Sequence, residues 1–269
     1  MQVTKTAPEW ALELFNKSVL KRRKYREVTA LLGDFAGRRC LDVGSDNGVI
    51  SYLLRQQGGD WSSADLNPQT VNAIRELVGD EVYQISGEAL PFPDQTFDRV
   101  AIIDFLEHIP DDRRFVDELH RTLKPGGWLI INVPHHKSTA LRRLRFRLGQ
   151  TDEKHGHLRP GYTLDDLQGL LGERFSVESA HTYSKFFSEL IDTLIVFAVT
   201  TLKGGGHSEK GLVVTSSDLK ANKSMFRLYS LIYPVVWVFS QLDALVPASG
   251  YMLIVKARKS EPTGHSRIA

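Results

Sequence analysis

The chain has 269 residues, of which 42% are hydrophobic and 25% charged, and its formal net charge is +2. This composition is sufficient for the core of one elaborated globular domain, and so small a net charge does not indicate a nucleic-acid partner. The single cysteine, Cys40, excludes an internal disulfide framework and favours a reducing, cytoplasmic compartment. We see neither an N-terminal signal peptide nor a run of 18 uncharged apolar residues.

Residues 1–37 are predicted to form an N-terminal helical segment. Trp10, Leu14 and Phe15 recur at helical spacing, and Gly33 is a suitable C-terminal stop. Between them lies a basic cluster at residues 21–26. This cluster is either a solvated helix face or a contact with phosphates, on a substrate or on an anionic membrane surface.

The next segment reads as a strand, a glycine turn and a helix, with the pattern Asp42-x-Gly44-x-x-x-Gly48. Two glycines let the backbone approach a ligand where a Cβ would obstruct it, and the carboxylate of Asp42 suits a ligand with a positive charge. The pattern lacks the G-x-G-x-x-G spacing of a nicotinamide-dinucleotide site. Strands and helices then alternate up to residue 134, which predicts a parallel, doubly wound sheet.

Acidic residues follow two further predicted strands. Asp65 ends the second strand, over residues 61–65, about twenty residues after the glycine turn, where a carboxylate can accept hydrogen bonds from both ribose hydroxyls. The alternative is an acidic residue that caps the helix after Asn67-Pro68. Asp104 follows the fourth strand, over residues 99–103.

Four segments in order resemble the class I S-adenosylmethionine-dependent methyltransferases, in particular the small-molecule, type-11-like members. They are the glycine turn, the acid at Asp65, the run Gly-Glu-Ala-Leu-Pro-Phe-Pro at 87–93 and the run Leu-Lys-Pro-Gly-Gly at 123–127. The family often has glycine where this chain has Asp46. The resemblance implies a Rossmann-like α/β fold with a seven-stranded, mostly parallel sheet and helices on both faces. It also implies S-adenosylmethionine as the cofactor, bound by Asp42, Gly44, Ser45, Gly48, Asp65, Leu66, Glu88, Ala89 and Asp104.

A hydroxyl acceptor needs a base within reach, and histidine is the usual choice near neutral pH. The chain offers histidines at 108, 135, 136, 155 and 157, and we select His108 and His157 as catalytic candidates because both fall in expected substrate-facing loops. Asp104-x-x-Glu107-His108 is also similar to a Glu-x-x-Glu-His motif that binds a divalent metal in quinone-biosynthesis O-methyltransferases and small-RNA terminal methyltransferases. We predict no metal as the default, with Asp104, Glu107 and His108 as the alternative Mg²⁺ or Mn²⁺ ligands.

The methyltransferase domain is predicted to span residues 38–258, with an apolar helical insertion at about 183–249 and a disordered tail at 259–269. Residues 175–181 and 251–257 read as two antiparallel strands that flank this insertion. The insertion has two apolar segments joined by a flexible linker at 203–208. Three interpretations are open for these segments: buried helices over the sheet edge, a monotopic lipid-binding surface, or a dimer interface. The arginine-rich residues 141–148 either contact anionic head groups or line the core edge.

The resemblance implies transfer of a methyl group from S-adenosylmethionine to a small-molecule or lipid-linked acceptor, such as a glycan, a quinone-like molecule or a lipid. The expected location is the cytoplasm or the inner face of a membrane, with peripheral membrane contact. Two alternatives remain: a catalytically inactive cofactor-binding module, suggested by Asp46, and an RNA methyltransferase, suggested by the basic clusters. The near-neutral charge disfavours nucleic acid, and the sequence does not indicate an oligomeric state.

Overall fold

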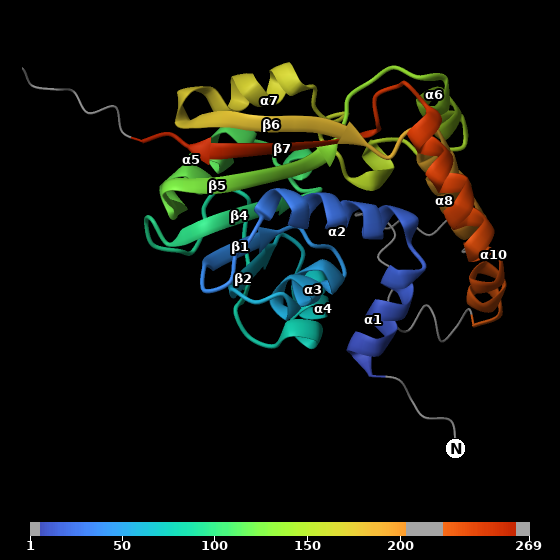
Figure 1. Ribbon diagram of the computed structural model, residues 1–269, viewed down its shortest axis with the longest axis horizontal. Helices are drawn as coiled ribbons and strands as arrows, with labels where there is room; N and C mark the ends of the chain where they lie inside the picture. The colour runs from blue at the N-terminus through green and yellow to red at the C-terminus, as the bar shows by residue number, and fades with distance from the viewer. Residues whose placement is uncertain (1–5, 203–222, 262–269) are drawn as a thin grey trace, which may run out of the picture.

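The computed structural model describes residues 6–202 and 223–261. One seven-stranded sheet forms the centre of the molecule, with strand order β3-β2-β1-β4-β5-β7-β6 (Figure 1). The strands are β1 Arg39–Val43, β2 Asp60–Asp65, β3 Val82–Gln84, β4 Phe97–Ile103, β5 Leu123–Pro134, β6 Phe175–Tyr183 and β7 Met252–Lys259. The first five strands pair in parallel, whereas β7 is antiparallel to both β5 and β6. The predicted Rossmann-like fold is therefore confirmed.

Helices cover both faces of this sheet, as the alternation of strands and helices predicts. Side chains cap the starts of two of these helices: the Asn67 side chain accepts a hydrogen bond from the Gln69 N–H at 2.8 Å, and Thr163 forms a capping box with Asp166. The helices are α1 Ala7–Asn16, α2 Val19–Leu32, α3 Val49–Gln56, α4 Pro68–Val78, α5 Asp112–Thr122, α6 Ala140–Arg147, α7 Leu164–Leu171, α8 Phe186–Leu202 and α10 Lys223–Gln241. Short 3₁₀ turns occur at η1 Leu106–His108, η2 Glu153–His155, η3 Gly172–Arg174 and η4 Leu242–Leu245.

Two hydrophobic cores lie on opposite faces of the sheet. On one face α5 and α7 pack on β4, β5 and β7, and on the other α2 and α3 pack on β1 and β4 (Figure 1). Val28 and Leu32 of α2 are fully buried in the second core together with Cys40. Burial raises the pKa of the Cys40 thiol to about 12, which fits the prediction of a core residue. The N-terminal helices therefore share a core with the sheet; a domain boundary at residue 37 stays a prediction.

The last two strands of the chain, β6 and β7, are longer than the sequence indicates. Tyr183 at the end of β6 pairs with Met252, and Phe175 pairs with Lys259 at the other end of the ladder. Lys259 is 7% exposed and its ammonium group donates to the carbonyl of Leu123 at 2.7 Å, so the prediction that the disordered tail begins at residue 259 is wrong. The predictions for the 203–208 linker and for residues 262–269 lie outside the described residues.

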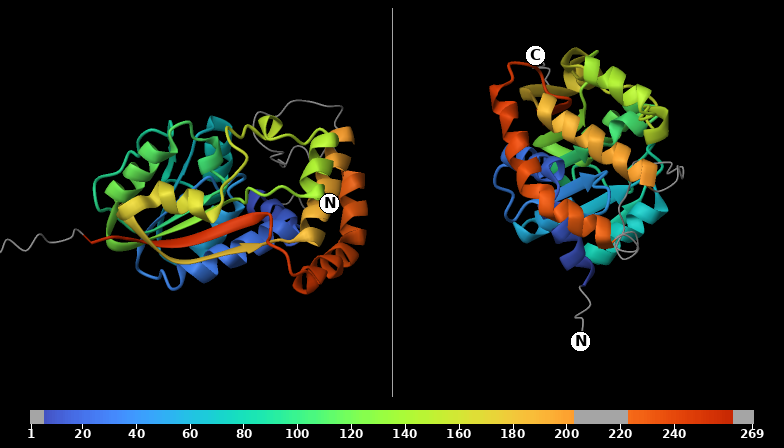
Figure 2. Two further views of the ribbon diagram at one scale, coloured as in Figure 1. Left: turned by 90° about the horizontal axis from the view of Figure 1, so that it is seen from above. Right: turned by 90° about the vertical axis from the view of Figure 1, so that its right-hand side faces the viewer.

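The insertion between β6 and β7 forms α8 and α10, which pack side by side across one end of the sheet (Figures 1 and 2). The inner face of α8 is buried at Ile191 and Thr193. In contrast, α10 exposes 78% of Leu231 and 71% of Val235. Burial over the sheet edge therefore does not account for the apolar character of α10. Among the described residues, no helix combines the length and apolarity needed to cross a bilayer.

Candidate active site

A cavity of about 390 Å³ opens where the C-terminal ends of β1, β2 and β4 meet. The strand order reverses between β1 and β4, and crevices at such switch points are where open α/β sheets bind ligands. We call the side of the cavity formed by Gly44, Asp46, Asp65 and Asp104 the strand-end wall. The opposite side, which we call the helical wall, comes from α6 and α8 and contains Arg142, Arg145, Glu189, Asp192 and Val196.

The glycine turn owes its shape to close packing. A Cβ on Gly44, at φ +85°, would lie 2.4 Å from the Ile103 carbonyl oxygen, and one on Gly48 would lie 2.7 Å from the Ile74 Cα. Gly44 also lines the cavity, so the absent side chain leaves the backbone open to a ligand. Asp46 adopts a left-handed φ of 60°, a conformation that aspartate tolerates better than most residues.

The carboxylate of Asp42 lies beneath the turn, where it is fully buried and does not line the cavity. It accepts hydrogen bonds from the hydroxyls of Ser51 at 2.5 Å and Ser63 at 2.7 Å, and Arg55 lies 3.5 Å away. Ser45 is also buried and hydrogen-bonded to Ser51. Burial raises the pKa of Asp42, and Arg55 and the serines oppose this rise. These contacts hold the turn in shape, and direct contact of Asp42 or Ser45 with a cofactor remains a prediction.

The residues predicted to contact an adenosyl group are dispersed. Asp65 is 2% exposed and lines the cavity at the end of β2, with Oδ1 accepting from the Asn67 N–H at 3.1 Å. Leu66 is half-buried against the core. Glu88 and Ala89 are exposed and do not line the cavity, and the Glu88 carboxylate lies 3.6 Å from Arg114. Asp65 is thus at the cavity, whereas the other predicted contacts would need a ligand that extends beyond it.

Glu107, on the short turn η1 after β4, is a fully buried acid. Neither of its carboxylate oxygens has a hydrogen-bond partner within the described residues. Burial, together with the nearby charge of Asp104, raises the pKa of Glu107 to about 8. A buried carboxylate without a donor is costly, and such a group indicates that a ligand supplies the missing interaction.

His108 and His157, the two catalytic candidates, lie beside Glu107. The Nδ1 of His108 donates to the Gly156 carbonyl at 2.8 Å, so the lone pair of this imidazole lies on Nε2. The two imidazole rings are 4.9 Å apart between centroids. Burial, followed by the neighbouring charges of His108 and His155, lowers the pKa of His157 to about 3, so its imidazole is neutral. The structure therefore brings together two histidines that are distant in the sequence.

This cluster has the donor set of a divalent-metal site. One ligand atom each from Glu107, His108 and His157 lie within 4.8 Å of one another. The unpartnered carboxylate and the fixed tautomer of His108 both fit a metal, since a ligating histidine usually donates its other nitrogen to a carbonyl or carboxylate. Asp104, predicted as a ligand, is instead engaged by Lys24 and by the Asn132 amide at 2.7 Å. In this cluster His157, not Asp104, lies within reach of Glu107 and His108, and the role of each of these residues as a metal ligand stays a prediction.

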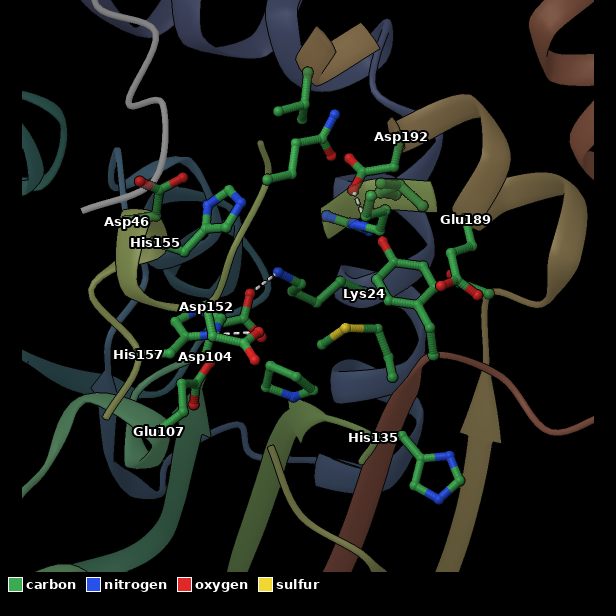
Figure 3. Close-up of a pocket in the computed structure, with 18 of the residues that line it drawn as sticks. Lys24, Asp46, Asp104, Glu107, His135, Asp152, His155, His157, Glu189 and Asp192 are labelled. Atoms are coloured by element: carbon green, nitrogen blue, oxygen red, sulfur yellow. Dashed lines mark hydrogen bonds and ion pairs between the residues drawn. The ribbon is translucent and has the colours of Figure 1, made fainter. Parts of the chain in front are cut away.

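Figure 3 shows Asp104, Glu107 and His157 gathered on one side of the cavity, with Glu189 and Asp192 on the opposite side. Of the other histidines, His155 lines the cavity and burial lowers its pKa, and His135 also lines it, with Nδ1 3.0 Å from the Gly250 carbonyl. His136 is not among the residues that line the cavity.

Several lining residues were missed by sequence reasoning. Three ion pairs span the helical wall and its surroundings: Arg142 with Asp152 at 2.6 Å, Arg145 with Asp192 at 3.1 Å, and Lys137 with Glu189 at 3.3 Å. Lys21 and Lys24 of α2 also reach into the cavity. The sequence signal that could have identified them is the three-residue spacing of Lys21 and Lys24, which places both side chains on one face of a helix.

Comparison with known proteins agrees with this geometry. Residues 41–131 match the model of a family described as a methyltransferase domain. This part of the chain is therefore similar to a methyltransferase domain. The matched segment begins in β1 and ends in β5, and thus spans the glycine turn, Asp65, Glu107 and His108 but not His157.

Individual curated relatives match only part of this chain. The ubiquinone biosynthesis O-methyltransferase of Pseudomonas entomophila is 36% identical over 105 residues, which are 36% of this chain and 45% of that protein. The demethylmenaquinone methyltransferase of Tropheryma whipplei is 28% identical over 109 residues, or 39% of this chain and 46% of that protein. The chain thus spans less than half the length of these curated relatives.

Solved structures resemble almost the whole chain. A putative methyltransferase from Bacillus halodurans covers 89% of this chain and 100% of its own, with a TM-score of 0.58 and 19% identity. The cyclase SpnF covers 90% of this chain and 82% of its own, with a TM-score of 0.59 and 17% identity. At such identities the likeness is one of fold, and the chemistry has to be argued from the site.

Proposed function

We propose that the protein transfers a methyl group from S-adenosylmethionine to a small, quinone-like acceptor. The observation that carries this proposal is that one cavity is lined both by Gly44 and Asp65 of the strand-end wall and by Glu107, His108 and His157. The relatives named as ubiquinone and menaquinone methyltransferases support the choice of acceptor class. Asp46 does not prevent such a function, because its left-handed backbone keeps the turn in the form that glycine would adopt.

The cofactor residues proposed are those of the turn and of the strand ends, with Asp65 in reach of the ribose hydroxyls. When bound, S-adenosylmethionine would supply an electrophilic methyl group, so the protein has to align an acceptor oxygen and exclude water. Polar and charged side chains line part of the cavity at Asp104, Glu107 and His157, which suits an acceptor with hydroxyl groups. His108 and His157 are the proposed catalytic residues at the acceptor.

Glu107, His108 and His157 are further proposed to hold a divalent cation. Such an ion would act as a Lewis acid that lowers the pKa of an acceptor hydroxyl. The carboxylate of Glu107 would then gain the partner that it lacks, and the neutral imidazole of His157 would offer a lone pair without first losing a proton.

The test is methylation of polyprenyl catechols and hydroquinones by the purified protein with radiolabelled S-adenosylmethionine. We expect transfer that falls at least tenfold on exhaustive chelation and returns with Mg²⁺ or Mn²⁺. Asp65→Ala should weaken cofactor binding in calorimetry, whereas Asp60→Ala, at the exposed start of β2, is the matched control. Cofactor binding without any product from this panel or from cell extract would favour an inactive binding module. Salt-sensitive methylation of RNA would favour the RNA alternative.

A lipid-linked acceptor and work at a membrane surface form the finer part of the proposal. The outer faces of α8, α10 and η4 form an exposed apolar surface, which consists of Phe186, Leu194, Phe197, Leu231, Ile232, Val235, Trp237, Val238, Phe239 and Leu245. Contiguous exposed surfaces of this kind mark interaction sites. Asp243 is the one charged residue between positions 229 and 250, and its carboxylate accepts from the Lys185 N–H at 2.7 Å.

Basic side chains flank this apolar surface. Helix α6 packs against α8 and exposes Arg143, Phe146 and Arg147. Apolar and aromatic residues flanked by arginines suit an anionic bilayer. Since α8 also carries Glu189, Asp192 and Val196 of the helical wall, a bilayer on its outer face would lie next to the cavity.

Flotation with phosphatidylcholine vesicles, with and without phosphatidylglycerol, tests this surface. We expect the wild type to float with anionic vesicles and the double variant Leu231→Glu/Val235→Glu to remain unbound. The double variant Gln95→Glu/Gln168→Glu adds the same charge at exposed sites away from α10 and should still bind. A wild type that ignores vesicles but dimerises through α10 would instead assign the surface to a second copy of the chain.

A further inference from the structure

A second cavity, of about 280 Å³, lies at the end of the sheet opposite the candidate active site. It opens where β4 and β5 begin and where β7 ends, away from α8 and α10 (Figure 1). Four cations line it, namely Arg38, Arg99, Lys124 and Arg258, but only one carboxylate, that of Asp98. None of these residues lines the cavity at the carboxyl ends of the strands.

The register of the sheet brings part of this second cavity into one row of side chains. Arg99 of β4 pairs with Trp128 of β5, and Trp128 pairs in turn with Arg258 of β7. Directly paired residues project from the same face of a sheet. The Arg99 guanidinium lies over the Trp128 ring, with Cζ 3.7 Å from the ring centroid. Arg258 Nε donates to the Gly126 carbonyl at 3.3 Å, so both guanidinium groups are held against the sheet.

Most of the positive charge at this cavity has no counter-charge in the protein. Lys124 Nζ lies 2.9 Å from the Asp98 carboxylate, so these two charges compensate each other. Within the residues that the structure describes, Arg38, Arg99 and Arg258 form no ion pair. Guanidinium groups that lie close together without an anion repel one another, which makes the empty cavity attractive to an anionic ligand.

Arg99 shows this lack of a partner most clearly. Its Nε is buried and has no hydrogen-bond acceptor among the described residues, and its Nη2 reaches only the Asp34 carbonyl, at 3.4 Å. Burial lowers the pKa of Arg99, and the nearby charge of Arg38 lowers it further. The charged guanidinium is therefore less stable here than in water, and an anion beside it would supply the missing counter-charge.

We propose that this second cavity binds a compact oxyanion, the phosphate or diphosphate group of a small molecule. Guanidinium groups match the oxygens of such groups in geometry as well as in charge. The volume of about 280 Å³ is close to the lower limit of small-molecule pockets, about 300 Å³. A single-stranded nucleic acid would instead need a groove of cations that follows its backbone. The inference does not depend on methyl transfer, because the two cavities have no residue in common.

Calorimetry with sodium diphosphate at constant ionic strength tests this site. We expect the wild type to bind one diphosphate ion per chain. Arg38→Gln and Arg258→Gln should each weaken this binding by about tenfold, the usual effect of losing one charged hydrogen bond. Both arginines are exposed, so both variants should fold. Diphosphate should also change the tryptophan fluorescence of the wild type, and Trp128→Phe should lack this change because the indole lies against Arg99.

Matched controls separate a specific site from general attraction of anions. Arg26→Gln and Arg113→Gln each remove the same charge from exposed positions on α2 and α5 and should bind diphosphate as the wild type does. The proposal would be overturned by equal affinity in all four arginine variants, or by a wild type that does not bind diphosphate. It would also be overturned by an RNA oligonucleotide that binds through Arg38 and Arg258 where diphosphate does not.

Discussion

The two walls of the cavity are held in place by different kinds of interaction. The strand-end wall consists of loops that directly follow β1, β2 and β4, and its turn is fixed by local packing and by the buried bonds of Asp42. The helical wall consists of α6 and α8, which the Arg145–Asp192 ion pair joins, and α6 is also held by the ion pair of Arg142 with Asp152. A wall built from strand ends is rigid because the sheet is rigid, whereas a wall held by charged pairs can be altered without loss of the fold.

The first test of this difference between the two walls is to add a side chain in the glycine turn. In Gly44→Val the new Cβ would lie 2.4 Å from the Ile103 oxygen and 2.8 Å from the Phe105 Cβ, at a φ of +85°. Overpacking and backbone strain together should lower the free energy of unfolding by about 4 kcal/mol, measured by urea denaturation. Gly79→Ala is the matched control, since φ is +81° there but no atom lies within 4 Å; about 1 kcal/mol is expected. Equal losses at both positions would show that packing does not hold the turn.

The second test concerns Asp42. Its removal in Asp42→Ala leaves two serine hydroxyls without their acceptor and Arg55 without its charged partner, so we expect a loss of about 3 kcal/mol in unfolding free energy. Urea denaturation measures this loss, and calorimetry measures cofactor binding in the same variant. A variant of undiminished stability that no longer binds cofactor would show instead that Asp42 contacts the ligand directly.

The third test addresses the helical wall through Arg142 and Asp152, whose side chains are 20% and 25% exposed. A double-mutant cycle to alanine should give a coupling energy of about 1 kcal/mol that falls with added salt. Affinity for S-adenosylhomocysteine should stay within twofold of the wild type in all three variants, because the pair lies opposite the strand-end wall. A cofactor affinity that follows the coupling energy would show that the two walls are not independent.

The smallest expected effect is at Glu88. Its ion pair with Arg114 is solvent-exposed on both sides, so Arg114→Ala should change the unfolding free energy by no more than about 0.5 kcal/mol. If Glu88 contacts adenine, as the family resemblance implies, Glu88→Ala should weaken cofactor binding while Arg114→Ala should not. Equal cofactor affinity in the two variants would show that Glu88 does not contact the cofactor.

The strand-end wall could be predicted from sequence because its determinants are local. The apolar strand before Gly44, the cap and proline at Asn67-Pro68, and the acid at Asp65 each lie within a few residues of the structure that they specify. The alternation of strands and helices then leaves few topologies for a parallel sheet, and the observed strand order is one of them.

The rest of the cavity required tertiary contacts that no local pattern encodes. His157 joins Glu107 because the Leu158 N–H donates to the Glu107 carbonyl at 2.9 Å and His108 binds the Gly156 carbonyl. The basic cluster on α2 showed that cations were present, but only the packing of α2 on the sheet turns Lys24 toward Asp104. Likewise, the hydrophobic residues of α10 could not indicate whether its outer face is covered, since an apolar helix has the same composition in either case.

The pairing of Tyr183 with Met252 has an evolutionary and practical consequence. These residues are the last of β6 and the first of β7, so the insertion leaves and re-enters the sheet at neighbouring positions on adjacent strands. Chain segments of very different length can bridge such a short gap, because the entropy of closing a loop grows slowly with its length. This insertion can therefore be exchanged without change to the sheet, and grafting it between β6 and β7 of another protein of this fold would transplant the α8 part of the helical wall as a unit.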